Sequence, residues 1–133
     1  NIGKAVRLAT SDSFNEIKNS ALHLLKNVSK MEINDIIATV KSVSEFKIDI
    51  QDYLDFLAVW YRDILYFKAT RDSNGLIFKD ELNVITDQIN KSSYEGIENI
   101  LRGLQTAKTR LNANVNFDLT MEMLALTIKE NIR

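Results

Sequence analysis

Residues 50–69 read IQDYLDFLAVWYRDILYFKA, and this stretch decides the fold. Its apolar side chains recur every three or four positions, as on one face of a helix: Tyr53, Leu57, Trp60, Ile64 and Phe67. Other large apolar residues fall between them and widen the apolar surface well beyond one face. A helix of this kind must be surrounded by other elements. We therefore predict a central helix that begins after Asp49 and ends near Ala69.

The composition favours helices throughout the chain. The 133 residues include four glycines and no proline, where average usage gives about six or seven prolines. Folds rich in strands need Gly and Pro at many turns, whereas helical bundles need few. With 45% hydrophobic residues, the chain has enough apolar side chains for one buried core. We predict an all-α fold, a compact bundle of about five to six helices.

Apolar periodicity predicts the other helices and the breaks between them. The expected helices cover residues 13–28, 33–45, 80–90, 92–112 and 117–131, and residues 1–9 form a further helical fragment. Ser92 is an expected N-cap, because Glu95 stands three residues later as in a capping box. Residues 71–75 and the Asn-rich residues 112–116 are the expected loops. The last helix is apolar nearly all round, like the central one.

Residue types that carry chemistry are scarce. Cysteine is absent, and His23 is the only histidine, without a candidate partner in the sequence. The acidic pairs Asp52/Asp55 and Asp80-Glu81 stand near predicted helix starts, where the helix dipole favours negative charge without a metal. No Gly-rich phosphate loop, Gly-x-Ser-x-Gly or His-Glu-x-x-His motif occurs. We therefore expect no catalytic site, no cofactor and no metal site.

The charges are balanced and dispersed along the chain. There are 17 basic and 18 acidic residues, and no apolar run approaches the length of a membrane span. We expect a soluble, cytoplasmic chain that binds neither a membrane nor DNA tightly. The alternative is a helical nucleic-acid-binding module. It depends on Tyr94, Arg102, Lys108 and Arg110, which give the predicted helix 92–112 some basic character.

Charged residues within the two most apolar helices need partners if they are buried. In the central helix these residues are Arg62 and Asp63. In the last helix Glu122 is the only charge between Asp118 and Lys129. We predict an ion pair between Arg62 and Glu122 that fixes the register of the two helices.

Three aromatic residues of the central helix, Tyr61, Tyr66 and Phe67, are candidates for an interface with another protein. A helix that is apolar on most sides can cover a neighbouring chain as well as its own core. In the alternative interpretation all three side chains are internal.

Two short motifs resemble a known family. The first is aromatic-x-Arg-Asp-Leu/Ile-Leu, and the second, about fifty residues later, is Leu-x-x-Asn-x-Asn-x-x-Leu-x-x-Glu-x-Leu. Together they resemble the C-terminal domain of bacterial DNA polymerase III delta-prime subunits. The matching residues are Trp60, Arg62, Asp63, Ile64 and Leu65, then Leu111, Asn114, Asn116, Leu119, Glu122 and Leu124. Gly3-Lys4-Ala5 is similar to the start of the last lid helix of the AAA+ module that precedes this domain.

The resemblance implies a non-catalytic helical collar domain over residues 11–133, with residues 1–10 as the end of the lid helix. Collar domains hold the clamp-loader subunits together while the machine places the sliding clamp on primed DNA. The implied partners are the delta and gamma/tau subunits, through their own collar domains. The gamma/tau subunit has a related collar domain and is the alternative, although the Arg-Asp and Asn-x-Asn segments favour delta-prime. The start at Asn1 rather than Met indicates a piece cut from a longer protein.

Overall fold

The computed structural model describes residues 12–132, and within that range every regular element is helical. The α-helices are α2 (Asp12–Asn27), α3 (Ile33–Val43), α4 (Ile50–Thr70), α5 (Leu82–Lys91), α6 (Tyr94–Asn112) and α7 (Phe117–Asn131). Short 3-10 turns lie between some of them, at Val28–Lys30, Ser44–Asp49, Ser73–Gly75 and Lys79–Glu81. The predicted all-α bundle is confirmed. The fragment expected over residues 1–9 and the boundary at residue 10 lie outside the described residues.

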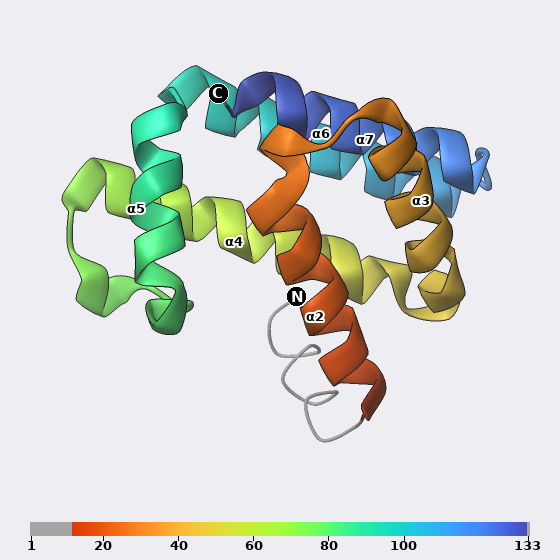
Figure 1. Ribbon diagram of the computed structural model, residues 1–133, viewed down its shortest axis with the longest axis horizontal. Coiled ribbons are helices and arrows are strands. Elements are labelled where there is room, and N and C mark those ends of the chain that lie inside the picture. The colour runs from red at the N-terminus through yellow and green to blue at the C-terminus, as the bar shows by residue number, and fades with distance from the viewer. Residues whose placement is uncertain (1–11, 133) are drawn as a thin grey trace.

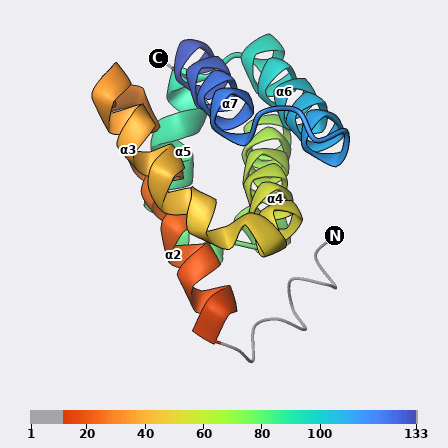
Figure 2. The same ribbon diagram turned by 90° about the vertical axis from the view of Figure 1, so that its right-hand side faces the viewer.

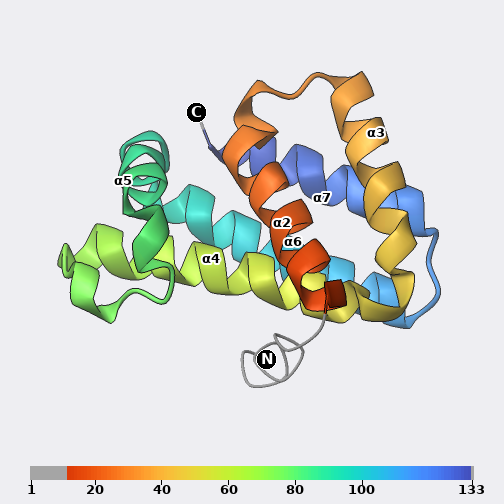
Figure 3. The same ribbon diagram turned by 60° about the horizontal axis from the view of Figure 1, so that its bottom comes forward.

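Three helices, α4, α6 and α7, run along the long axis of the molecule (Figure 1). Figure 2 looks along them and shows α6 and α7 side by side, with α4 below α6. Helix α6 packs against both of the others, whereas α4 and α7 share few contacts with each other. The remaining helices cross this layer: α2 and α5 pack on α4, and α3 packs on α7 (Figure 3).

Helix α4 is the centre of the core, as its sequence predicts. More than half of its residues are buried, and Tyr53, Leu57, Trp60 and Ile64 are completely inaccessible. The helix ends where Arg71 adopts a left-handed conformation (φ 57°) and donates its N–H to the carbonyl oxygen of Phe67. The predicted loop at residues 71–75 therefore begins with a standard helix stop.

Asparagines shape the connection between α6 and α7 in two different ways. Asn114 adopts the left-handed conformation (φ 60°) that asparagine tolerates better than most residues. Asn116 is the N-cap of α7, because its side-chain oxygen accepts a hydrogen bond from the N–H of Leu119 at 2.8 Å. Both conformations agree with the break predicted at residues 112–116, and α7 covers the predicted range.

The N-cap predicted for α6 was wrong by one residue. Ser93 caps this helix, and its hydroxyl oxygen accepts from the N–H of Gly96 at 2.9 Å. Ser92 is buried instead and donates its hydroxyl to the carbonyl oxygen of Gln88, at the end of α5. Two adjacent serines offered the same capping chemistry, and the burial of Ser92 against α5 decided between them.

Candidate interaction surface

The Trp60 side chain anchors a polar network inside the bundle. Its indole N–H donates to the Oε1 of Gln88 at 3.1 Å, and the Gln88 amide nitrogen donates to the carbonyl oxygen of Leu25 at 2.9 Å. These two hydrogen bonds join α4, α5 and α2. Sequence reasoning missed Gln88, because a polar residue in a short amphipathic helix gives no sign that it is buried. Trp60, the aromatic residue of the first motif, therefore stabilises the fold.

Asp63 is a buried charged residue of α4, and its hydrogen-bond partners are backbone N–H groups. It is only 5% exposed, and one carboxylate oxygen accepts hydrogen bonds from the N–H groups of Ile77 and Phe78, at 2.9 and 2.8 Å. Burial raises the pKa of the Asp63 carboxyl, although these two hydrogen bonds partly offset the rise. The bonds fix the loop after α4, so that the Phe78 ring packs against Trp60 at 5.5 Å between centroids.

The ion pair predicted between Arg62 and Glu122 was wrong. Arg62 is exposed on α4, Glu122 is half-buried on α7, and the two side chains form no ion pair in the described chain. The physical reason is that α4 and α7 both pack on α6 and share few contacts with each other, while Arg62 lies on the solvent side of α4. Since Arg62 reaches solvent, it needs no buried partner.

The interface predicted for three aromatic residues of α4 is wrong for two of them. Tyr61 is completely buried and Phe67 is 9% exposed, so both belong to the core of the domain. Tyr66 is exposed, and its hydroxyl donates to a carboxylate oxygen of Asp72 in the adjacent loop. Of the three, only Tyr66 has a side chain that a partner can reach.

Helix α7, in contrast, exposes a row of large apolar side chains. Leu119, Met123 and Leu126 are 54%, 45% and 36% exposed. Their spacing of four and three residues places them on one face of the helix. We call these three residues the α7 stripe. Within the family motif, Leu119 belongs to this surface, whereas Asn114 and Asn116 shape the turn before it. The apolar sequence of α7 gave a signal for the stripe, but periodicity alone could not say which face lacks cover.

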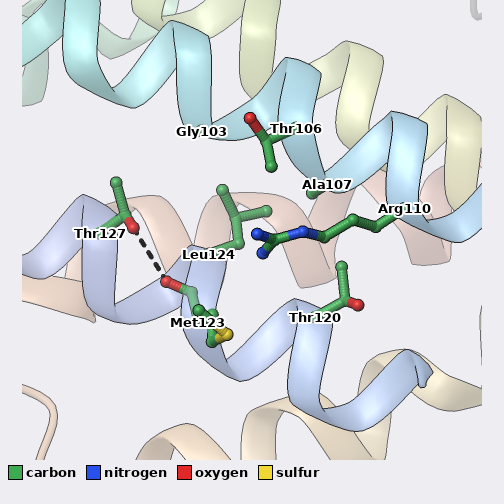
Figure 4. A pocket seen from close by; sticks show the side chains of 8 residues that line it. All are labelled: Gly103, Thr106, Ala107, Arg110, Thr120, Met123, Leu124 and Thr127. Carbon is green, nitrogen blue, oxygen red and sulfur yellow. Dashed lines mark hydrogen bonds between the residues drawn. The ribbon is translucent and has the colours of Figure 1, made fainter. Parts of the chain in front are cut away.

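A groove of about 230 Å³ runs beside the stripe, between α6 and α7. The residues that line it are Gly103, Thr106, Ala107, Arg110, Thr120, Met123, Leu124 and Thr127 (Figure 4). Small residues on α6 keep the helices close: a Cβ on Gly103 would stand 3.1 Å from the Cγ2 of Thr127. The guanidinium of Arg110 extends from α6 across the groove toward Leu124 (Figure 4).

The basic residues named for nucleic-acid binding do not form a positive stripe on α6. Lys108 is neutralised by Asp55, with 2.6 Å between the ammonium nitrogen and a carboxylate oxygen. Arg102 is hydrogen-bonded to Asn99, and the hydroxyl of Tyr94 donates to the backbone of Lys68. Arg110 alone faces the groove. This arrangement is unlike the row of free cations that tracks a phosphate backbone.

Other kinds of site find little support in the described part of the chain. No group of three His, Asp or Glu side chains among residues 12–132 could hold a metal ion. His23 is exposed, and its ring nitrogen stands 3.5 Å from the side-chain amide of Asn27, a neighbour one turn away. No described helix is both long and apolar enough to cross a membrane. The α7 stripe and the adjacent groove are features that the geometry offers to a partner, and Ile33 and Ile37 of α3 are also exposed.

Comparison with known proteins assigns the chain to a family. The family described as "DNA polymerase III, delta subunit, C terminal" matches residues 16–130. The chain is also similar to DNA polymerase III subunit delta' of Bacillus subtilis (strain 168), with 26% identity over 133 residues. That match covers 98% of this chain but only 40% of the relative. No solved structure matches the chain. The chain therefore belongs to the family formed by the C-terminal domains of DNA polymerase III delta subunits.

Proposed function

We propose that this chain is a non-catalytic assembly domain of a bacterial clamp loader. In this role it holds subunits in the collar ring that supports the loading of sliding clamps onto primed DNA. Residues 11–133 form the collar domain, residues 1–10 end the lid helix before it, and the protein acts in the cytoplasm. The partners are the delta and gamma/tau subunits. The delta' name of the Bacillus subtilis relative supports delta-prime rather than gamma/tau as the source of this domain.

The observation that carries the proposal is the α7 stripe. Leu119, Met123 and Leu126 are exposed to water at helical spacing. Most other large apolar residues of the described chain are buried. Contiguous exposed apolar surface of this kind marks protein–protein contacts in soluble proteins. A helix face with anchors at positions i, i+4 and i+7 is suited to packing against helices of another chain.

The proposal is tested by binding of the chain to the delta and gamma/tau subunits of the same bacterium. The test variant replaces Leu119 and Leu126 with serine, and the matched control replaces the exposed Ile77 with serine, away from α7. We expect the wild-type chain and the control to co-elute with at least one subunit in size-exclusion chromatography. We expect the double variant to elute alone, while its melting temperature stays within a few degrees of wild type, since exposed positions contribute little to folding.

A second measurement separates assembly from nucleic-acid binding. Fluorescence anisotropy with primed DNA at physiological salt should give no submicromolar affinity for the chain alone, because its formal net charge is −1 and α6 carries no row of free cations. Failure of every subunit to bind, combined with tight and salt-dependent DNA binding, would contradict the proposed function and favour a nucleic-acid module.

A further inference from the structure

The groove between α6 and α7 contains a positive charge, on the exposed Arg110, that has no partner among the described residues. The guanidinium of Arg110 forms no hydrogen bond or ion pair with any described residue, although it points across the groove rather than away from it (Figure 4). None of the eight residues that line the groove is acidic. An arginine in this setting presents its planar fork of donors to any carboxylate that enters.

Thr120 adds an apolar group, and not a polar one, to the groove. The residue is 3% exposed and its hydroxyl oxygen is inaccessible to solvent. Figure 4 shows its methyl group toward Arg110 and its oxygen turned away. The neighbouring hydroxyl of Thr127 donates to the carbonyl oxygen of Met123 at 3.0 Å. Arg110 is therefore the one charged group among the residues that line the groove.

We infer that this groove receives a carboxylate side chain, Asp or Glu, carried on an amphipathic helix of a partner subunit. The inference rests on the proposed function and names the chemistry of the partner at that same surface. The carboxylate pairs with Arg110, and the apolar residues beside it on the partner helix pack on the α7 stripe. A single cation in a groove that the exposed Met123 also lines suits one anionic side chain in an apolar setting. A nucleic-acid backbone would need several cations in a row.

The groove is shaped for such a side chain. Arg110, Met123 and Leu124 line the same groove, so a side chain that enters it meets the guanidinium beside apolar groups of α7 (Figure 4). Once the partner helix covers the groove, the ion pair is removed from water. Losing one member of a covered, hydrogen-bonded charge pair then weakens binding much more than losing an exposed pair.

The test reverses the charge of Arg110 and compares it with another arginine of the same helix. The variants are Arg110→Glu and Arg110→Gln, and the matched control is Arg102→Glu, an exposed arginine on an adjacent face of α6. Affinity for the delta and gamma/tau subunits is measured by isothermal titration, and stability by thermal melting. We expect Arg110→Glu to weaken binding at least about thirtyfold and Arg102→Glu to change it by less than about threefold. Replacing the acidic residue of the partner by arginine should restore binding to Arg110→Glu.

The alternative outcomes are distinct. Arg110 stands in the last turn of α6, where a positive charge also favours the helix end. A purely structural role would lower the melting temperature of both Arg110 variants and leave the affinity unchanged, which overturns the inference but not the proposed function. Self-association of the wild-type chain that Arg110→Glu abolishes would make a second copy the occupant and overturn the assignment to another subunit. Absence of any subunit binding by wild type would overturn the proposed function and this inference with it.

Discussion

Helix α4 is covered on most sides by the rest of the domain, whereas helix α7 leaves one apolar face in water. The two helices have similar composition, and each is apolar around most of its circumference. Around α4, the other helices and the loop after it bury Trp60, Tyr61 and Phe67. Around α7, the packing neighbours are α6, α3 and the turn at Val28–Lys30, and they leave the α7 stripe exposed.

This difference in burial distinguishes apolar residues that stabilise the fold from apolar residues that contribute little to it. Side chains on α4 should control the free energy of unfolding, and those of the α7 stripe should control binding. Helix α7 still contributes to the fold through its other faces, on which Met121, Leu124 and Ile128 are buried. The two helices therefore make opposite predictions for substitutions of similar size.

The largest effect is expected at Trp60, on α4. Truncation by Trp60→Ala removes a completely buried ring and leaves the Oε1 of Gln88 without its donor. We expect a loss of about 3–5 kcal/mol in the free energy of unfolding, measured by urea denaturation followed by circular dichroism. The matched truncation on α7, Leu119→Ala, should stay within about 0.5 kcal/mol of wild type, because that side chain is exposed. Equal losses at the two positions would break the comparison.

The next largest effect is expected at Asp63. In Asp63→Ala, the N–H groups of Ile77 and Phe78 lose their acceptor, and the loop that carries Phe78 is released. We expect a loss of about 2–3 kcal/mol and faster amide hydrogen exchange in residues 76–80. Asp63→Asn keeps an acceptor oxygen in place and should retain most of the stability. A loss in Asp63→Asn as large as that in Asp63→Ala would show that the charge, and not the acceptor, holds the loop.

The same carboxyl predicts a dependence on pH. Because burial raises the pKa of Asp63, the folded state binds its proton more tightly than the unfolded chain does. The contribution of this group to stability is therefore greatest below pH 3.8 and falls as the pH rises through the folded pKa. Asp63→Asn lacks that fall. Its stability relative to wild type should consequently increase between pH 3 and pH 7 in urea titrations.

An intermediate effect is expected at the start of α7. Asn116→Ala removes the side-chain oxygen that accepts from the N–H of Leu119. The expected loss is about 1 kcal/mol in the free energy of unfolding. Asn116→Asp should be neutral or better, since it keeps the cap and places a negative charge at the helix N-terminus. If Asn116→Ala weakened subunit binding without lowering stability, the turn itself would belong to the interface.

Local patterns in the sequence were enough to predict most of the fold. Local residues determine apolar periodicity and the conformations that asparagine adopts. These two signals were enough to predict the range of α7, the start of α3 and the loop after α4. The error at Ser92 was also local, since two serines in a row are equally good caps and only the burial of one against α5 distinguishes them.

The candidate site was harder to predict, because it depends on which helices become neighbours. Pairing Arg62 with Glu122 assumed that α4 and α7 pack on each other, and periodicity contains no information that both pack on α6 instead. The same applies to Arg110, whose significance comes from the lack of an acidic residue in the groove that it faces. Gln88 was missed because its partners come from two other helices.

The smallest effect is expected at Tyr61, which makes the comparison more specific. Its ring is completely buried, yet its hydroxyl has no hydrogen-bond partner in the structure, so the apolar ring stabilises the fold and the hydroxyl does not. Tyr61→Phe should therefore leave the free energy of unfolding unchanged or raise it by up to about 1 kcal/mol.

Burial, with a smaller effect of Tyr53, raises the pKa of the Tyr61 phenol, so the folded state resists its ionisation. Stability of the wild type should then fall above about pH 10, where unfolded tyrosines ionise, and Tyr61→Phe should lessen that fall. Loss of more than about 1 kcal/mol in Tyr61→Phe at pH 7 would mean that the hydroxyl is paired in solution and that α4 is less dry than its sequence predicts.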